Sequence, residues 1–204
     1  ASVCSAVSSS QTIVYINNIA YTCPELANKL VFKQCAKIPY SFTTIVPGAQ
    51  TGVRFVFVSV SGLGAIGSNG TIITCSNGTV SPVYQTQYYL TMSANPSNGG
   101  TVSPSSAWYN AYSTVSISAS PNSGYEFVNW TGYNLTPYGA QQGYVPSGAY
   151  SGTSESTSVT MNNPIIEVAN FKLITYTVTF TESGLPNGTT WNVTFNGNTK
   201  SSTG

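Results

Sequence analysis

Apolar and polar residues alternate along most of the chain, and this period of two predicts β-strands. Residues 53–60 are apolar at every position except Arg54 and Ser59, as in a central strand covered on both faces. Turn sequences separate the strands at short intervals, and the chain is therefore predicted to be all-β, with immunoglobulin-like or pilin-like β-sandwich domains. The alternation is clearest for Leu90, Met92 and Ala94, for Val115, Ile117 and Ala119, for Tyr176, Val178 and Phe180, and for Trp191, Val193 and Phe195.

One short N-terminal helix is predicted to interrupt the strands. Residues 24–34 (PELANKLVFKQ) begin with Pro and Glu, which suit the first turn of a helix, and carry Lys residues towards the other end. Lys29, Lys33 and Lys37 would share one face of that helix. We interpret this basic stripe as a solvated surface rather than a binding patch.

Four cysteines, Cys4, Cys23, Cys35 and Cys75, predict two disulfides and an oxidising, extracellular location. If the helix extends from Cys23 to Cys35, about 18 Å separates their Cα atoms, whereas a disulfide needs about 7 Å or less. These two residues are therefore each expected to pair with Cys4 or Cys75. Zinc binding is the rival interpretation, but no Cys-X-X-Cys spacing supports it.

The composition removes most routes to catalysis. The chain has no Asp and no His, only 5% of it is charged, and its net charge is +1. Acid–base and metal chemistry rely heavily on Asp and His, so we expect neither enzymatic activity nor a cofactor. Nucleic-acid binding is not expected either, because it requires clustered Lys and Arg. With Glu as the sole acidic side chain, stability is expected to depend little on pH down to about pH 3.

Six Asn-X-Ser/Thr sequons are present, at Asn69, Asn77, Asn129, Asn134, Asn187 and Asn192. Several lie beside Gly or Pro turn signals, where a modifying enzyme could reach them. N-linked glycans are thus expected, and they would supply the solubility that charge does not. No run of about 18 apolar residues occurs, so no membrane span is predicted. The opening ASVCSAVSSS is similar to a mature terminus left by a signal peptidase, which favours an extracellular location at the cell surface.

Residues 88–172 resemble the internalin-B-type repeat of secreted and cell-wall proteins. The similarity is carried by YYLTMSANPSNGGTVSPSSAWY, SPNSGYEFVNWTG and TSVTMNNPIIEVANFK in that order, with an insertion at about 133–156. Residues 175–197 (TYTVTFTESGLPNGTTWNVTFNG) resemble a small β module of archaeal surface proteins, including thermopsin-like acid proteases. Such repeats are spacers and interaction modules, so the resemblance implies a structural role.

The two ends of the chain indicate assembly by strand exchange. Residues 11–21 predict a strand whose donor residues Ile13, Val14, Tyr15 and Ile16 need burial on both faces. The C-terminal module is expected to lack the later strands that its resemblance implies. A strand of one copy that filled the groove of the next, head to tail, would produce a filament. The chain is divided accordingly into a donor tail (1–20), a disulfide-stapled region (21–85), a repeat-like region (86–172) and an incomplete module (173–204).

These features together resemble the filament subunits of the archaeal thread, which assemble by donor-strand complementation. The resemblance implies a glycosylated pilin in a homopolymer of identical subunits, used for adhesion or cell–cell contact. The acceptor groove is expected in or near residues 173–204. Whether the N-terminal or the C-terminal strand is the donor is left open by the sequence.

A secreted acid peptidase is the first alternative function. Glutamic peptidases use a Glu and a Gln on a β-sandwich, and the chain has several residues of both types. Glu126, beside Tyr125 and Trp130, is the best candidate for a raised pKa. The repeat pattern, however, places Glu126 in a strand of a structural module.

A carbohydrate-binding surface module is the second alternative, because Trp108, Trp130 and Trp191 could stack on sugar rings. Core packing explains Trp130 and Trp191 better, since both share strand faces with other apolar residues. In the insertion, three aromatic residues could contact a neighbouring subunit or a surface. They are Tyr138, Tyr144 and Tyr150.

Overall fold

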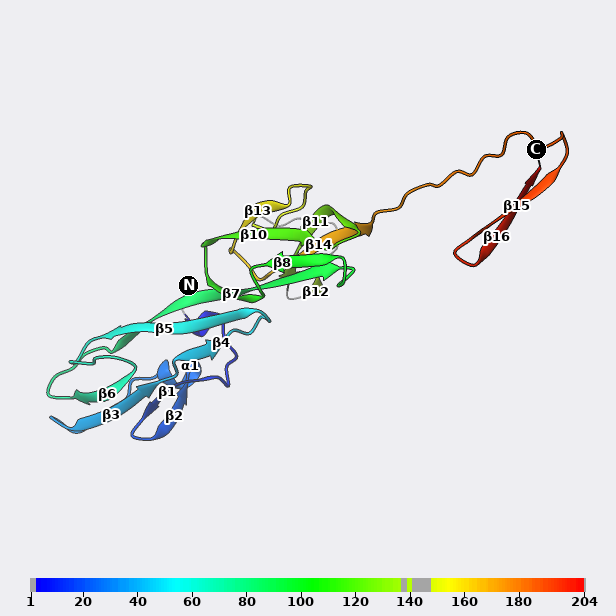
Figure 1. Cartoon of the computed structure of the whole chain (residues 1–204). Helices are drawn as coiled ribbons and strands as arrows, with labels where there is room; N and C mark the ends of the chain where they lie inside the picture. Colours follow the sequence, from blue (N-terminus) through cyan, green and yellow to red (C-terminus); the bar gives the residue numbers. More distant parts are fainter. Residues whose placement is uncertain (1–2, 137–138, 141–147, 204) are drawn as a thin grey trace. The chain divides into compact units, whose positions relative to one another are not determined.

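The structure is a computed structural model that describes residues 3–136, 139–140 and 148–203, and it confirms the all-β fold (Figure 1). The chain divides into two compact units, residues 1–173 and 174–204. No helix in the described part is long and apolar enough to cross a membrane. The short helical turns are η1 (Val3–Ser5) and α1 (Cys23–Leu26).

The strands of the first half of unit 1 are β1 (Thr12–Ile16), β2 (Ile19–Thr22), β3 (Lys37–Phe42), β4 (Ile45–Pro47), β5 (Val53–Ser61), β6 (Asn69–Ile73) and β7 (Ser81–Asn95). Those of its second half are β8 (Gly100–Ser103), β9 (Ala107–Asn110), β10 (Thr114–Pro121), β11 (Tyr125–Thr136), β12 (Gly139–Ala140), β13 (Ser156–Thr160) and β14 (Ile165–Leu173). The second unit contains β15 (Thr190–Phe195) and β16 (Asn198–Thr203).

The N-terminal region (residues 3–80) contains a four-stranded sheet in the order β2-β1-β3-β6. In β3, Ile38, Tyr40 and Phe42 are buried and alternate with exposed residues, so one face of the sheet forms a core. Val14 of β1 joins this core from the same sheet, and Phe57 of β5 packs against it from the larger sheet. The region is therefore built from two layers.

The central region (residues 81–173) is a β-sandwich. A three-stranded sheet, β13-β10-β8, packs against β11, β14 and β7, which belong to a larger sheet in the order β12-β11-β14-β7-β5-β4. β14 pairs antiparallel with β11 and parallel with β7. Both layers contribute to one core, whose fully buried side chains include Leu90, Ile117, Trp130, Val159, Met161 and Ile165.

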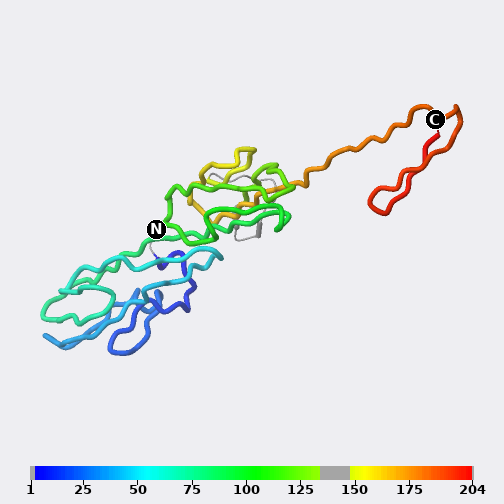
Figure 2. Tube along the Cα trace, in the orientation of Figure 1, coloured from blue at the N-terminus to red at the C-terminus, as the bar shows by residue number. Residues whose placement is uncertain are grey.

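The long strand β7 belongs to both regions. Its first half pairs with β5, and its second half pairs with β14 and packs into the central core. The trace in Figure 2 follows the chain from one region into the other along this strand. β7 therefore runs across the boundary predicted between residues 85 and 86.

The helix predicted over 24–34 is wrong beyond its first turn, because residues 27–36 form no regular secondary structure. Thr74, which follows β6, binds this segment instead. Its N–H donates to the carbonyl of Ala36 and its carbonyl accepts from the N–H of Cys35, both at 3.1 Å. These bonds continue the pairing of β3 with β6. A short helix needs tertiary packing to be stable, and here the tertiary contacts favour the sheet, so the predicted basic helix face does not form.

Residues 11–21 form a hairpin instead of the single strand that the pattern predicts. β1 and β2 pair antiparallel around Asn17 and Asn18, whose φ angles are positive, at 51° and 64°. Two consecutive residues with positive φ are what a tight type I′ turn requires, and Asn tolerates this backbone. The Asn-Asn pair is thus a turn signal that the surrounding apolar residues obscure.

The apolar run at 53–60 is a strand, β5, but only one of its faces packs into a hydrophobic core. Phe55 is buried, whereas Arg54 and Val56 on the opposite face are half-buried, and Val58, at a bulge in the pairing with β7, is exposed. The predicted burial on both faces is therefore wrong. An uninterrupted apolar run indicates a strand here without indicating how many layers pack on it.

The second unit contains one hairpin, β15–β16, among its described residues. Its turn is Asn196-Gly197, with φ angles of 47° and 77°, which is the sequence preferred in two-residue hairpin turns. β15 confirms the strand predicted around Trp191. The strand predicted around Val178 is not formed, because residues 174–189 belong to no strand.

Candidate functional site

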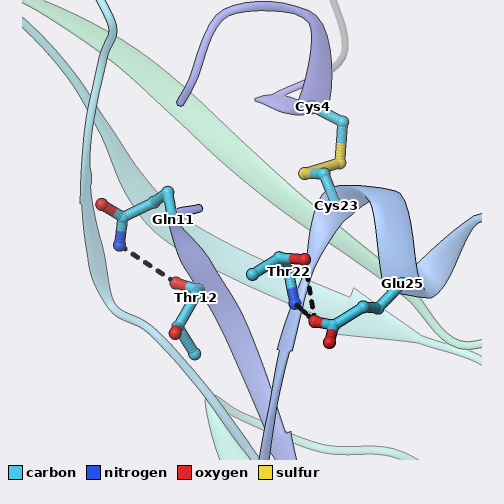
Figure 3. The surroundings of a disulfide bond; sticks show 6 residues. All are labelled: Cys4, Gln11, Thr12, Thr22, Cys23 and Glu25. Atoms are coloured by element: carbon cyan, nitrogen blue, oxygen red, sulfur yellow. Dashed lines mark hydrogen bonds between the residues drawn. A yellow bond between two sulfur atoms is a disulfide. The ribbon is translucent and has the colours of Figure 1, made fainter. Parts of the chain in front are cut away.

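Two disulfides link segments of the N-terminal region. Cys4 bonds to Cys23, which joins η1 to α1 (Figure 3). Cys35 bonds to Cys75, which joins the irregular segment after α1 to the chain that follows β6. Cys23 and Cys35 are not joined to each other, and the reason is the tertiary pairing of the segment around Cys35 rather than a long helix.

Glu25 fixes the start of α1. One oxygen of its carboxylate accepts hydrogen bonds from the backbone N–H and the hydroxyl of Thr22, at 2.7 and 2.8 Å (Figure 3). The backbone bond, followed by the hydroxyl bond, holds the pKa of Glu25 below its ordinary value. This cap and the adjacent disulfide together position the single turn of α1.

A cleft of about 1210 Å³, whose lining is more apolar than polar, lies in the N-terminal region. Its walls come from β1, from the segment 26–34, from the inner face of β3 and from residues 76–84 at the start of β7. Burial here raises the pKa of Tyr84 to about 12, which agrees with apolar surroundings. Val83 in the lining is 52% exposed, so the cleft opens to solvent.

The start of β7 has an unpaired edge beside this cleft. β5 pairs with residues 81–88 along one edge of β7. On the other edge, β9 pairs from Gln87 onwards, and the N–H of Ala111 donates to the carbonyl of Thr86 at 2.9 Å. Within the described chain, residues 81–85 therefore have a strand neighbour on one side only. The cleft is lined by residues 81–84, so it adjoins this part of β7.

The predicted donor segment is part of the chain's own sheet. β1, which contains Ile13, Val14, Tyr15 and Ile16, pairs with β2 on one side and with β3 on the other. Ile13 and Val14 are only 4% and 3% exposed, because they pack into two different hydrophobic clusters. Donation of β1 to another copy would require this strand to leave its sheet first.

A second segment carries apolar residues without a strand partner. Tyr176, Val178 and Phe180 alternate with Thr residues, lie outside the strands of the second unit and are exposed. When such a segment is extended, its apolar residues form one row on one face. Residues 175–181 are thus able to act as a β-strand if a partner edge is supplied.

The predicted glycosylation sites differ in exposure. Asn134 lies in β11, and its side chain is outside the described residues. Asn129 is half-buried, and its side-chain oxygen accepts a hydrogen bond from Asn170 at 2.8 Å. The same Asn170 amide group donates to the hydroxyl of Thr131 at 2.8 Å, so it engages both polar residues of that sequon. The exposed sites are Asn69, Asn77, Asn187 and Asn192.

Glu167 is a buried carboxyl group that sequence analysis missed. It is fully buried on the core face of β14, where one oxygen accepts a hydrogen bond from the N–H of Tyr150 at 2.7 Å. Its other oxygen has no hydrogen-bond partner among the described residues. Burial raises the pKa of Glu167 to about 7, although the bond from Tyr150 acts in the opposite direction. Glu167 lies at every-second-residue spacing between Ile165 and Ala169, and this spacing could have predicted that its side chain faces the core.

Glu126, the candidate proposed from sequence for a raised pKa, is exposed. It forms an ion pair with Lys172 at 3.2 Å, on the neighbouring strand of the same sheet. The geometry around Glu126 therefore gives no support to the peptidase alternative.

The three tryptophans occupy different environments. Trp130 is buried in the central core, 6.0 Å from the ring of Phe127, so it is a packing residue. Trp191 and Trp108 are half-buried, in β15 and β9. Of the tyrosines predicted to lie in a loop, Tyr150 is half-buried, and Tyr138 and Tyr144 lie outside the described residues.

The first part of the chain thus defines an all-β, disulfide-linked module. Residues 90–175 match the family profile of the divergent InlB B-repeat domain, which agrees with the internalin-B-type repeat seen in the sequence. The match begins within β7 and covers the strands of the central sandwich that follow it. It indicates a module of the kind found in extracellular surface and adhesion proteins. No curated protein and no solved structure matches the chain.

Proposed function

We propose that the chain is the structural subunit of an extracellular, glycosylated filament in which a strand of one copy fills the cleft of the next. The observation that carries this proposal is the apolar cleft beside the unpaired edge of residues 81–85. Unpaired N–H and C=O groups next to apolar surface are the usual acceptor for an added strand. The B-repeat match supports a location on the cell surface, where the filament would serve adhesion or cell–cell contact. No catalytic role is proposed.

The donor in this proposal is the segment 175–181 of a second copy. At about 3.3 Å per residue it would extend over about 20 Å, which is enough to pair with the whole free edge of β7. Its row of Tyr176, Val178 and Phe180 would enter the apolar cleft. β1 is the weaker candidate because it already lies between two strands. The acceptor then lies in the N-terminal region rather than in residues 173–204, where the sequence had placed it.

Electron microscopy of the full chain tests the proposal directly. Donation from one copy to the next does not close on itself, so long fibres about one domain wide are expected. Val178→Asp would put a charge into the apolar row and should abolish the fibres. Thr177→Asp, on the opposite face of the segment, is the matched control and should leave them intact. Discrete particles from the unmodified chain would contradict the filament, whereas fibres that survive Val178→Asp would contradict only the choice of donor.

Cross-linking between two different variants identifies the contact itself. One preparation carries Val83→Cys in the cleft and the other carries Val178→Cys in the donor segment. If the segment of one copy enters the cleft of another, mixing the two should give a disulfide-linked heterodimer on a non-reducing gel. Thr177→Cys in place of Val178→Cys should give much less, because its side chain would face away from the cleft.

A further inference from the structure

We propose that the outer face of β5, β7 and β9 is a binding site for an acidic polysaccharide, in which Arg54 binds the carboxylate of a uronic acid residue. These three neighbouring strands place Arg54 opposite Gln87 and Gln87 opposite Asn110. Two residues further along β7, Tyr89 lies opposite Trp108. Tyr88 and Leu90 pack at the central core. Because side chains alternate along a strand, Gln87 and Tyr89 face outward.

The hydrogen bonds along this row leave mainly donors for a ligand. The Nε of Arg54 donates to the side-chain oxygen of Gln87 at 2.8 Å, and the amide nitrogen of Gln87 donates to the side-chain oxygen of Asn110 at 3.0 Å. A guanidinium group can only donate, so it orients Gln87, and Gln87 in turn orients Asn110. Both amide oxygens are engaged within the row. Among the described residues, the Nη groups of Arg54 and the amide nitrogen of Asn110 have no hydrogen-bond partner and can bind acceptor oxygens.

The aromatic residues hold the arginine in position. The guanidinium carbon of Arg54 lies 4.4 Å from the ring centre of Trp108, and the ring centres of Trp108 and Tyr89 are 5.1 Å apart. A guanidinium fixed on a ring and by its Nε loses little conformational freedom when it binds a carboxylate through two parallel hydrogen bonds. Only Lys172 and Glu126 form a salt bridge among the described residues, so no carboxylate of the described chain neutralises Arg54.

The chemistry of the site favours a sugar acid over other anions. A uronic acid combines a carboxylate with hydroxyl oxygens that accept from Asn110, and its ring carries C–H groups that pack on half-buried aromatic surface. An acidic peptide would satisfy the charge of Arg54 but would use less of the aromatic pair. The inference adds a ligand to the proposed surface role, and it does not depend on assembly into filaments.

Titration calorimetry of the full chain with an oligogalacturonate, at neutral pH and low salt, measures this binding. Arg54→Gln should weaken binding at least about tenfold, because it removes a charge-assisted pair of hydrogen bonds. Arg54→Lys keeps the charge without the planar fork and should give an intermediate loss. Lys200→Gln, on β16, removes the same charge elsewhere and should leave affinity unchanged. A neutral cello-oligosaccharide should bind at least about tenfold more weakly than the oligogalacturonate.

Three results would overturn the inference. The first is no binding of oligogalacturonate at millimolar concentration by the unmodified chain. The second is an equal loss of affinity in Arg54→Gln and Lys200→Gln, which would show that binding depends on the net charge of the chain and not on a site at Arg54. The third is equally tight binding of polyglutamate, which would assign the site to acidic peptides. Circular dichroism verifies that each variant is folded. Fibre formation by Arg54→Gln should be normal, so the ligand and the filament are tested separately.

Discussion

The N-terminal and central regions share the strand β7 but are stabilised in different ways. The central region has one continuous core around Trp130 and contains no cysteine. The N-terminal region has two smaller hydrophobic clusters, an open cleft and both disulfides. A cleft lacks the packing contacts that a filled core supplies, whereas a disulfide stabilises by restricting the unfolded chain. The region that leaves room for another strand is thus the one that depends on covalent links.

If packing stabilises the central region, Trp130→Ala should have the largest effect of the changes considered. Removal of a fully buried tryptophan costs about 3–5 kcal/mol of unfolding free energy, through lost burial and the cavity that is left. Urea denaturation followed by circular dichroism measures the loss. Trp191→Ala, at a half-buried position in the hairpin of unit 2, is the control. A loss no greater than that of the control would show that the central core is not the source of stability.

If covalent links stabilise the N-terminal region, replacing Cys35 and Cys75 by Ser should cost about 4 kcal/mol, and replacing Cys4 and Cys23 about 3 kcal/mol. The difference follows from sequence separations of 40 and 19 residues. All three tryptophans lie outside this region. Trp108 contacts Arg54 of β5, so the fluorescence of the buried Trp130 is measured in a Trp108→Phe, Trp191→Phe variant and should remain native after reduction. The part of the near-ultraviolet circular dichroism that comes from Tyr15, Tyr21 and Tyr40 should be lost. Loss of both signals together would mean that the two regions unfold as one.

The buried Glu167 should make the central region more stable in acid. Its pKa is raised from 4.5 to about 7 in the folded chain, so the folded state binds the proton more tightly than the unfolded state. The resulting stabilisation is complete below about pH 4.5 and is lost as the pH rises to about 7, a difference of roughly 3 kcal/mol. Glu167→Gln, which does not titrate, should remove this dependence.

Thermal unfolding at several pH values between 4 and 8 measures this effect. Glu25, whose pKa is lowered, acts in the opposite direction, but it is exposed and its effect is screened by solvent. The composition alone predicts that stability changes little in acid. The burial of Glu167 predicts instead that stability increases on acidification. A fall in melting temperature on acidification from pH 7 to pH 4.5 would refute the assignment.

The smallest expected effect concerns glycan occupancy and separates two asparagines that both lie in strands. Asn192 in β15 is exposed, whereas Asn129 in β11 is half-buried and bonded to Asn170. Glycopeptide mass spectrometry of protein isolated from the surface of the cells that produce it should find a glycan on Asn192 and none on Asn129. A glycan on Asn129 would mean that the strands β11 and β14 pair only after modification.

Several elements could be predicted because their cause is local. The alternation of Val115, Ile117 and Ala119 predicts β10 correctly, since a strand buries every second residue whatever its partner. The hairpin of residues 11–21 could have been predicted from the sequence, but its Asn-Asn turn is flanked by apolar residues that obscure it. The candidate cleft could not have been predicted, because its walls come from segments as far apart as β1 and β7.

By itself, the sequence determined the all-β class, the positions of the cysteines and sequons, and the B-repeat character of its middle part. Only the tertiary structure decided that Cys35 pairs with Cys75, that the segment before Cys35 is not helical, and that Glu167 is buried. The tertiary structure also brought Arg54 onto Trp108. The physical reason is the same in each case. A strand's period follows from its own backbone, whereas these features depend on contacts between residues tens of positions apart, whose free energy no local window contains.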